Sequence, residues 1–276
     1  MEAFSARWSL KGRTALVTCG SRGIGKAIVE ELAYFGASVF TCSRVSSHLE
    51  ECLFEWQQAA LQVAGTVCDA GSRQGRLHLI RDVSHHFGGK LDIFVNNVGV
   101  IEVKPAIDVT EDDFASTISL NLEAEYHFSQ LVHPLLKAAG NGRIVFVSSI
   151  LGMMTPAFPC SVYAMCKGAT NQLTRVLAAE WVKDSILVNA VAPGVIDTES
   201  QVAESHSKTT RDIPMERAGS PREAAAAVAF FCLPCSSFCT GQIFIVDGGT
   251  TVRPAFAPSK ATTVSVPSKG RSASLG

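Results

Sequence analysis

The chain has 276 residues, of which 47% are hydrophobic and 18% charged, and its formal net charge is −1. That hydrophobic share can fill a large core at this length, which excludes an intrinsically disordered chain. The balanced charge provides no basic excess for nucleic acid or an anionic membrane surface. The longest apolar run, residues 224–233, is ten residues long and too short to cross a bilayer. Because the N-terminus also lacks the features of a signal peptide, we expect a soluble cytoplasmic protein with no nucleic-acid or membrane partner.

Short β-rich runs alternate with longer helical stretches, a pattern typical of a parallel sheet covered on both faces. The first half predicts strands at 14–18, 38–42, 62–67 and 91–96, separated by helices at 23–35, 46–60 and 72–87. The second half predicts a helix at 113–139, a strand at 143–148, a helix at 162–182, a strand at 186–191, a helix at 221–232 and a strand at 242–246.

These elements predict a single α/β domain over residues 1–253. Its architecture is a Rossmann-type, doubly wound parallel sheet of about seven strands with helices on both faces. No clear boundary interrupts the alternation. Residues 254–276 are rich in Ser, Thr, Lys and Pro and contain no acidic residue. Since such a segment buries too little apolar area to offset its ordering entropy, we expect a disordered tail there.

The nine cysteines are too sparse for a disulfide scaffold, and their number is odd. The spacing of Cys232, Cys235 and Cys239 superficially resembles a metal or redox cluster. It has neither a second cysteine pair nor a nearby histidine to close a tetrahedral site. We therefore expect small buried or half-buried thiols and no bound metal.

A glycine turn, residues 18–25 (TCGSRGIG), joins the first strand to the first helix. Glycines let the backbone approach a pyrophosphate, whose charge is met by the N–H groups at the helix N-terminus. The place of the turn inside a βαβ unit favours a dinucleotide site over a chance glycine cluster. The residues expected to contact the cofactor here are Thr18, Gly20, Ser21, Arg22, Gly23, Ile24 and Gly25.

The end of the second predicted strand, residues 41–44 (TCSR), decides between the two nicotinamide dinucleotides. An acidic residue that binds the adenosine ribose diol is expected about 20 residues past the glycines, and none is present. A carboxylate there would repel a 2′-phosphate, whereas Arg44 and Ser43 can bind one, with Arg22 as a further candidate. A lone solvated arginine is the simpler interpretation of Arg44. Together with the missing carboxylate, however, the presence of Arg44 favours NADP(H) over NAD(H).

Tyr163 and Lys167 are four residues apart and lie on the same face of a predicted helix. A free tyrosine titrates near pH 10, so it is a poor acid–base group at neutral pH. A neighbouring lysine cation favours the phenolate and can lower the pKa of Tyr163 toward the working range. The fifth strand ends just upstream, at Ser148 and Ser149, on the edge where open α/β sheets bind ligands.

Over about residues 10–249 the chain resembles the short-chain dehydrogenase/reductase family. The resemblance rests on Thr18…Gly23-x-Gly25, Asn96-Asn97-Val98-Gly99, Asn121, Ser149, Tyr163-x-x-x-Lys167 and Val191-Ala192-Pro193-Gly194. Their order and separation are together highly specific. Residues 7–12 (RWSLKG), 41–44 and 215–219 (MERAG) are similar to the tropinone reductase-like branch of plants.

The resemblance implies the catalytic roles. Tyr163 protonates the carbonyl oxygen as hydride arrives from the nicotinamide, and Lys167 lowers the pKa of Tyr163 and holds the nicotinamide ribose. Ser149 orients the substrate oxygen, so Ser149 and Tyr163 are the substrate-binding pair, while Asn121 holds a water in the proton relay.

The resemblance also implies further cofactor contacts. Asp69 is similar to the family's adenine contact, and Asn97 and Gly99 line the cofactor. Tyr163 and Lys167 themselves belong to the cofactor site. Ile196 and Thr198 meet the carboxamide, in the segment that begins with Pro193 and Gly194. Read singly, Asn97, Asn121 and Asp69 are ordinary turn or cap residues.

Several positions depart from the family pattern. Cys19 replaces the first glycine of the turn, so its side chain crowds the loop and is strained if φ is positive there. Val98 replaces the usual alanine and adds bulk near the cofactor. Ser149 lies fourteen residues before Tyr163 rather than thirteen, so one residue must be accommodated between them. Ser148, the neighbouring serine, is the less suitable candidate for the role of Ser149.

The function expected from these residues is NADPH-dependent reduction of a ketone to an alcohol. The substrate is expected to be cyclic, of alkaloid or terpenoid type, in a pocket built from Met153, Met154, Phe158 and the loop at 195–215. Acidic residues in that loop, Asp197, Glu199 and Glu204, suggest a preference for an amine-bearing ketone. The alternative is a catalytically impaired dinucleotide-binding protein, because of Cys19 and Val98. Helices 113–139 and 162–182 are expected to assemble a homodimer or homotetramer.

Overall fold

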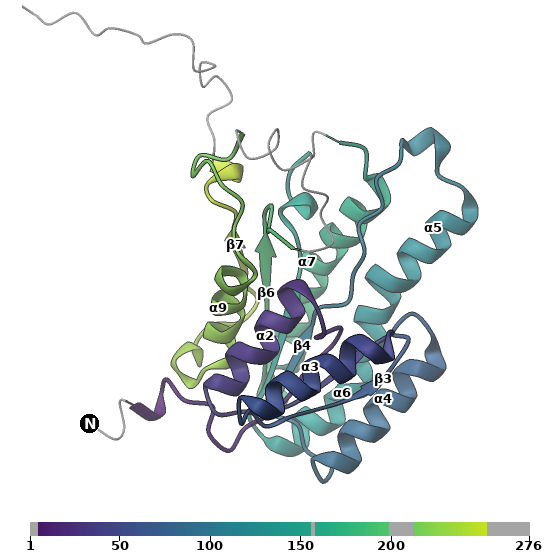
Figure 1. Cartoon of the computed structure of the whole chain (residues 1–276). Helices are drawn as coiled ribbons and strands as arrows, with labels where there is room; N and C mark the ends of the chain where they lie inside the picture. The colour runs from purple at the N-terminus through teal and green to yellow at the C-terminus, as the bar shows by residue number, and fades with distance from the viewer. Residues whose placement is uncertain (1–4, 156–157, 199–211, 253–276) are drawn as a thin grey trace, which may run out of the picture.

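The computed structural model describes residues 5–155, 158–198 and 212–252, and its centre is a seven-stranded parallel sheet (Figure 1). The strands are β1 (Thr14–Val17), β2 (Ser38–Ser43), β3 (Val63–Val67), β4 (Ile93–Asn96), β5 (Gly142–Val147), β6 (Ile186–Pro193) and β7 (Ile243–Val246). Their order across the sheet is β3-β2-β1-β4-β5-β6-β7. The strand order reverses between β1 and β4, which is where doubly wound sheets bind ligands at their carboxyl ends.

Helices cover both faces of the sheet, as predicted. One face packs against α2 (Gly23–Tyr34), α3 (Ser46–Gln58) and α9 (Pro221–Cys232). The other packs against α4 (Arg73–His86), α6 (Ala124–Ala139) and α7 (Ser161–Trp181), with α5 (Glu111–Ile118) lying beside α7. Short helical turns follow at η1 (Ala106–Asp108), η3 (Ile150–Gly152), η4 (Val182–Asp184), η6 (Pro234–Ser236) and η7 (Thr250–Val252).

Alternating side chains divide each central strand between two hydrophobic cores. In β4, Ile93 and Val95 join the core beneath α2 and α9, whereas Phe94 joins the core beneath α6. All three side chains are essentially inaccessible to solvent. This is the burial expected of a parallel strand whose two faces are both covered. The sheet therefore holds the residues at the carboxyl ends of its strands in fixed positions.

The helix predicted at 113–139 is interrupted. α5 begins two residues earlier, at a capping box in which Thr110 accepts from the backbone of Asp113 and the Asp113 side chain accepts from Thr110. A π-helical segment, η2 (Ser119–Glu123), then separates α5 from α6. Such wide turns are frequent at functional sites, and Asn121 lies inside this one.

Some expectations fall outside the described residues, namely the tail at 254–276 and the loop acids Glu199 and Glu204. Within the described residues, no group of three His, Cys, Asp or Glu side chains is placed to hold a metal ion. Burial raises the pKa of the Cys232 thiol to about 12. Across the same residues, no helix is both long enough and apolar enough to span a membrane.

Candidate active site

A groove of about 560 Å³ opens where the chain leaves the carboxyl ends of β1, β4, β5 and β6. Its walls are Cys19, Arg22, Gly23, Ile24, Gly25, Asn97, Val98, Gly99, Val100, Ile101, Val147, Ser148, Ser149, Ile150, Leu151, Phe158, Tyr163, Lys167, Pro193, Gly194, Val195, Ile196 and Thr198. Among the described residues, several predicted site residues are not part of these walls: Thr18, Gly20, Ser21, Ser43, Arg44, Asp69 and Asn121. The groove thus joins the glycine turn to the tyrosine–lysine pair.

The glycine turn is packed too closely for side chains at two of its positions. A Cβ atom at Gly20 would lie 2.1 Å from Thr41 Oγ1, and one at Gly25 would lie 2.3 Å from the Cys19 carbonyl oxygen. Gly23, at φ +51°, begins α2 and directs the helix N-terminus into the groove wall. This backbone forms a cradle of the kind that admits a diphosphate close to the main chain.

Asn97 holds the glycine turn in place. Its side-chain Nδ2 donates to the carbonyl oxygens of Thr18 at 3.3 Å and Cys19 at 3.2 Å. Its backbone N–H donates to Thr18 Oγ1 at 2.9 Å, and Thr18 itself is fully buried. Asn97 therefore acts on the cradle as a brace as well as lining the groove.

Cys19 adopts the left-handed conformation, with φ +54°, so the strain expected for a side chain at this turn is present. The thiol lies beside Cys42 at the end of β2. A hydrogen bond from Cys42 holds the pKa of the Cys19 thiol below its ordinary value, and the positive charge of Arg44 acts in the same direction.

The corner predicted to bind a 2′-phosphate contains hydroxyls and cations. Ser21 Oγ donates to Ser43 Oγ at 2.9 Å, and both side chains are buried. Arg22 and Arg44 are exposed, and the Arg22 guanidinium contacts the ring nitrogen Nε2 of His48. The sequence motif gave no signal for His48, because it lies in the first turn of α3, 26 residues after Arg22.

The predicted adenine contact, Asp69, follows β3 and is exposed. Its Oδ1 accepts from the Gly71 backbone N–H at 3.1 Å, just before α4. The side chain therefore shapes its own turn, as an ordinary turn residue would, and lies beyond the groove walls.

Ser149 and Tyr163 come together despite the extra residue between them. The Ser149 side chain forms a hydrogen bond with the Tyr163 hydroxyl, and it also accepts from the Leu151 backbone N–H at 3.2 Å, which caps η3. Ser148 instead donates to Asn171 Oδ1 at 2.7 Å and is turned toward α7. Of the two serines, Ser149 is thus the one beside the phenol.

Lys167 lies one helical turn beyond Tyr163, with Nζ 5.9 Å from the centre of the tyrosine ring. The ammonium donates to the Val147 carbonyl oxygen at 3.0 Å and to Glu125 Oε1 at 2.7 Å. Glu125 comes from α6 and is fully buried. The sequence motif did not indicate Glu125, because Glu125 and Lys167 are 42 residues apart.

Lys167 acts on the pKa of Tyr163 in the predicted downward direction, but the net pKa is raised and does not move toward the working range. Burial, the largest effect, raises the pKa of Tyr163 above its ordinary value. Lys167 and the Ser149 hydrogen bond act downward without overcoming it, and Glu125 acts upward. Tyr163 is therefore a protonated phenol at neutral pH, which suits a proton donor.

Asn121 is buried in the π-helical segment η2 and ties it to the chain after β4. Its Nδ2 donates to the carbonyl oxygens of Val100 at 3.1 Å and Thr117 at 2.9 Å, and its Oδ1 accepts from the Val100 N–H at 3.0 Å. A Cβ atom at Gly99 would lie 3.0 Å from Asn121 Oδ1 and 3.6 Å from Lys167 Nζ. Because Gly99 has no side chain, the main chain that lines the groove here can lie close to Asn121 and Lys167.

The chain after β6 forms the remaining wall. A Cβ atom at Gly194 would lie 2.8 Å from the Asp247 side chain, so a larger residue cannot be accommodated there without rearrangement. Ile196 is buried, and the Thr198 side chain lies over Gly23. Phe158 lines the groove as expected, whereas Met153 and Met154, also expected in the pocket, are not among the described residues that line it.

A glycine cradle and a group of buried Ser149 and Lys167 with half-buried Tyr163, set at the switch point of a doubly wound sheet, are typical of a nucleotide-binding oxidoreductase. A family profile described as enoyl-(acyl carrier protein) reductase matches residues 19–251. The chain belongs to the short-chain dehydrogenase/reductase family, whose members use nicotinamide dinucleotide cofactors.

Relatives and solved structures agree with this assignment. A tropinone reductase homolog of Arabidopsis thaliana is 51% identical over 252 residues, covering 90% of this chain and 94% of its own length. A tropinone reductase homolog of Datura stramonium is 50% identical, covering 89% and 94%. A 7α-hydroxysteroid dehydrogenase, solved with NADH and 7-oxo glycochenodeoxycholic acid, is 33% identical with a TM-score of 0.84, covering 89% and 96%. The structure of gox2181 gives a TM-score of 0.86 at 28% identity, covering 91% and 100%.

Proposed function

We propose that residues 1–253 form one catalytic domain that reduces a ketone to an alcohol with NADPH. The observation that carries the proposal is half-buried Tyr163, whose hydroxyl is hydrogen-bonded to Ser149 and which lies one turn from Lys167, in the same groove as the glycine cradle. The hydride is the chemistry that a bound nicotinamide dinucleotide supplies. The chain supplies orientation, exclusion of water and the proton.

The protein's part of the reaction follows from the positions of three side chains. Ser149 donates a hydrogen bond to the substrate carbonyl oxygen and thereby aims it at Tyr163. Tyr163 donates its hydroxyl proton to that oxygen as negative charge develops on it. The Lys167 ammonium stabilises the phenolate that remains. Asn121, through the π-helical turn, is the proposed anchor of a water that returns the proton.

Two measurements test the reaction. Purified protein with NADPH is assayed against a panel of cyclic ketones, and we expect turnover with at least one of them. Tyr163→Phe, which keeps the ring and removes the proton, is expected to lower kcat by roughly 10²–10⁴-fold while cofactor binding persists. Wild-type activity retained by Tyr163→Phe would refute the proposed role.

NADP(H) is proposed as the cofactor because the end of β2 carries Ser43 and Arg44 with no acidic residue, and Arg22 lies across from them in the glycine turn. A guanidinium binds a phosphate monoester through charge-assisted hydrogen bonds that a ribose diol cannot replace. The enzyme would therefore distinguish NADPH from NADH by interactions made only with the 2′-phosphate.

Arg44→Ala tests this choice. We expect KM for NADPH to rise about tenfold or more, and KM for NADH to stay within about twofold, because one charge-assisted hydrogen bond is lost only with NADPH. Arg81→Ala, on the exposed side of α4, is the matched control. A kcat/KM that is higher with NADH than with NADPH in the wild-type enzyme would overturn the assignment.

A cyclic ketone of alkaloid or terpenoid type is the proposed substrate. Two of the relatives are named as tropinone reductase homologs, and a structural neighbour holds a 7-oxo steroid acid. The groove wall beside Tyr163 is correspondingly apolar, with Ile101, Ile150, Leu151 and Phe158. The preference for an amine-bearing ketone stays a prediction, because Asp197 is not among the described residues that line the groove. Equal turnover of neutral and cationic ketones of one ring size would remove that preference.

A second candidate is a dinucleotide-binding protein without turnover, which the strained Cys19 favours. The cradle would then bind NADPH weakly or in an unreactive position, although the proton-transfer residues are present. Binding of NADPH by fluorescence, combined with no reduction of any ketone in the panel, would support this candidate over the first.

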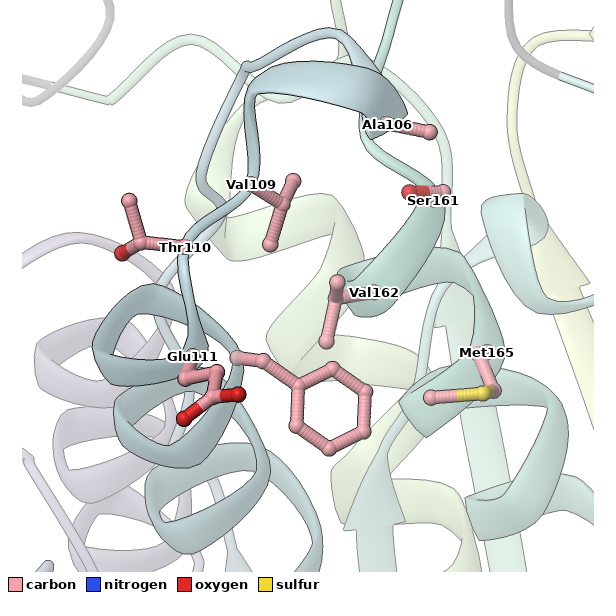
Figure 2. Close-up of a pocket in the computed structure, with 8 residues that line it drawn as sticks. Ala106, Val109, Thr110, Glu111, Ser161, Val162 and Met165 are labelled. Carbon is pink, nitrogen blue, oxygen red and sulfur yellow. The ribbon is translucent and has the colours of Figure 1, made fainter.

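Family members typically oligomerise, and we propose a homodimer or homotetramer built on α5, α6 and α7. A hollow of about 460 Å³ separates the start of α5 from the start of α7. Figure 2 shows Val109 on one side of this hollow and Val162 and Met165 of α7 on the other. Phe114 and Met165 are both about half exposed, at 46% and 51%. Such apolar exposure on one surface is typical of a subunit interface.

A further inference from the structure

Glu125 is a buried carboxylate for which the mechanism above has no use. Its side chain is inaccessible to solvent, and Lys167 is only 2% exposed. Lys167 Nζ donates to Oε1 at 2.7 Å, and Thr170 Oγ1 donates to Oε2 at 2.5 Å. Both carboxylate oxygens are therefore engaged, one by the lysine of the proposed catalytic group and one by the next turn of the same helix.

Because Lys167 and Glu125 are both buried, the charge of each strongly affects the ionisation of the other. Taking one charge out of water costs several kcal/mol unless a partner of opposite sign lies beside it. For Lys167, burial is the largest effect and lowers the pKa, but the attraction of Glu125 and then of Tyr163 outweighs it, so the pKa is raised overall. Lys167 is therefore held in its cationic form by a carboxylate on α6.

The same carboxylate also weakens what the cation does to the phenol. A negative charge at 2.7 Å from the ammonium opposes its field at neighbouring groups and cancels part of it. For Tyr163, burial raises the pKa most, and Glu125 acts in the same direction, against Lys167 and Ser149. Glu125 thus cancels part of the effect of the ammonium on Tyr163, and the effect of Lys167 remains the larger of the two.

We propose that Glu125 is a positioning residue, which fixes the Lys167 ammonium against the end of β5 and cancels part of its field at Tyr163, so that the phenol keeps its proton and the site favours reduction over oxidation. The inference deepens the proposed function and rests on the role given there to Tyr163. Reduction needs the phenol as proton donor, whereas oxidation of the alcohol needs the phenolate as acceptor.

Few other groups can account for a change in the titration of Tyr163. Among the described residues, the titratable or charged groups facing Tyr163 or Lys167 are Glu125 from α6, Cys160 before α7, and Cys166 within α7, with Ser149 as the uncharged hydrogen-bond partner. Cys160 and Cys166 are thiols whose pKa is raised by burial, that of Cys166 to about 11. Glu125 is thus the carboxylate among them; burial raises its own pKa, against the downward effects of Lys167 and Thr170.

The test is a titration of Tyr163 that does not depend on turnover. The chain has three tyrosines, and Tyr34 and Tyr126 are exposed. Subtracting the ultraviolet phenolate titration of Tyr163→Phe, made in each background, isolates Tyr163. Glu125→Gln removes the charge and keeps the size, so we expect the Tyr163 midpoint to fall by about 1 unit or more. The alkaline limb of kcat/KM for ketone reduction should move to lower pH by the same amount.

Two matched variants separate this role from a purely structural one. Thr170→Val removes the second hydrogen bond and keeps the charge, so its midpoint should stay within about 0.3 units of wild type. Glu125→Asp keeps the charge and should restore most of the wild-type midpoint. A Glu125→Gln protein that titrates like wild type, whatever its stability, would overturn the proposal.

Glu125→Gln leaves the Lys167 charge buried without its partner and can fail to fold. In that case, the double variant with Glu125→Gln and Lys167→Gln, which buries no charge, is compared with Lys167→Gln. The single variant, which keeps the carboxylate, should have the higher Tyr163 midpoint, and equal midpoints would overturn the proposal. A midpoint that shifts as expected while no ketone is reduced would support the coupling and instead contradict the proposed reaction.

Discussion

The thiol of Cys19 stands where the chain leaves β1 for the glycine turn, half-buried on the groove wall. Because the Cys42 hydrogen bond and Arg44 lower its pKa, a larger fraction is thiolate at neutral pH than for an ordinary cysteine. We expect iodoacetamide at pH 7 to alkylate Cys19 fastest of the nine cysteines, as mapped by peptide mass. NADPH should slow the reaction, and preferential labelling of another cysteine would contradict the assignment.

The left-handed backbone at Cys19 leads to a second prediction for the same residue. Glycine adopts φ +54° without strain and removes a side chain from the cradle wall. Cys19→Gly should therefore lower Kd for NADPH severalfold, or about 1 kcal/mol, as measured by cofactor fluorescence. Cys19→Ser keeps the β-carbon and serves as the control. Equal Kd values for the glycine and serine variants would show that the side chain does not crowd the cofactor.

Whether a site residue can be found from the sequence depends on where its partner lies. Tyr163 and Lys167 were predictable because helical geometry alone puts positions four apart on one face. Glu125 was not, because its contact with Lys167 exists only after α6 and α7 have packed on the same sheet face. His48 was not predictable for the same reason, because its contact with Arg22 forms only in the folded chain. The net rise in the pKa of Tyr163 was not predictable either, because its main cause is burial, which cannot be read from a motif.

At the scale of an element, α9 begins at a capping box in which Ser220 and Glu223 accept from each other's backbone N–H groups. The Arg217 hydrogen bond, then that from the Ser220 backbone, holds the pKa of Glu223 at about 2. A carboxylate with a lowered folded-state pKa contributes stability above its ordinary pKa, and that contribution is lost as the pH falls toward 2.

Glu223→Gln should therefore destabilise the protein at pH 7, and its difference from wild type should shrink steadily below about pH 4. Denaturant unfolding at a series of pH values measures the difference. Glu51→Gln, which replaces an exposed carboxylate on α3, is the control and should change the free energy of unfolding little at any pH of the series. A deficit for Glu223→Gln that grows on acidification would have the wrong sign for this cap.

The strands and helices themselves were predictable to within a few residues, since both faces of the sheet are buried and each strand is a short apolar run. Pro221 also marked the start of α9, since proline is allowed in the first turn of a helix. The π-helical break at 119–123 was not predictable, because the 3.6-residue apolar pattern runs on through it into α6. Its cause is tertiary: the Asn121 side chain is bound to the chain after β4.

At the scale of the whole molecule, the two faces of the sheet are covered by helices, but in the described part of the chain the outer surface of α5 and α7 keeps apolar side chains exposed. Phe114 and Met165 line the hollow between these helices, and Tyr126, Val176 and Val182 add exposed apolar area on α6, on α7 and just beyond it. A second copy of the same surface would bury these side chains by a two-fold contact, which is the commonest way in which soluble chains pair.

Met165→Glu places a charge at the edge of this hollow, and burying it against a second copy would be costly. We expect the wild-type protein to elute as a dimer or tetramer in light-scattering chromatography and Met165→Glu to shift toward the monomer. Phe54→Glu, at another exposed apolar residue but on α3, should leave the assembly unchanged. Since α7 also carries Tyr163 and Lys167, the monomeric variant should lose activity in proportion to its loss of assembly. A wild-type monomer, or equal disruption by both substitutions, would place the interface elsewhere.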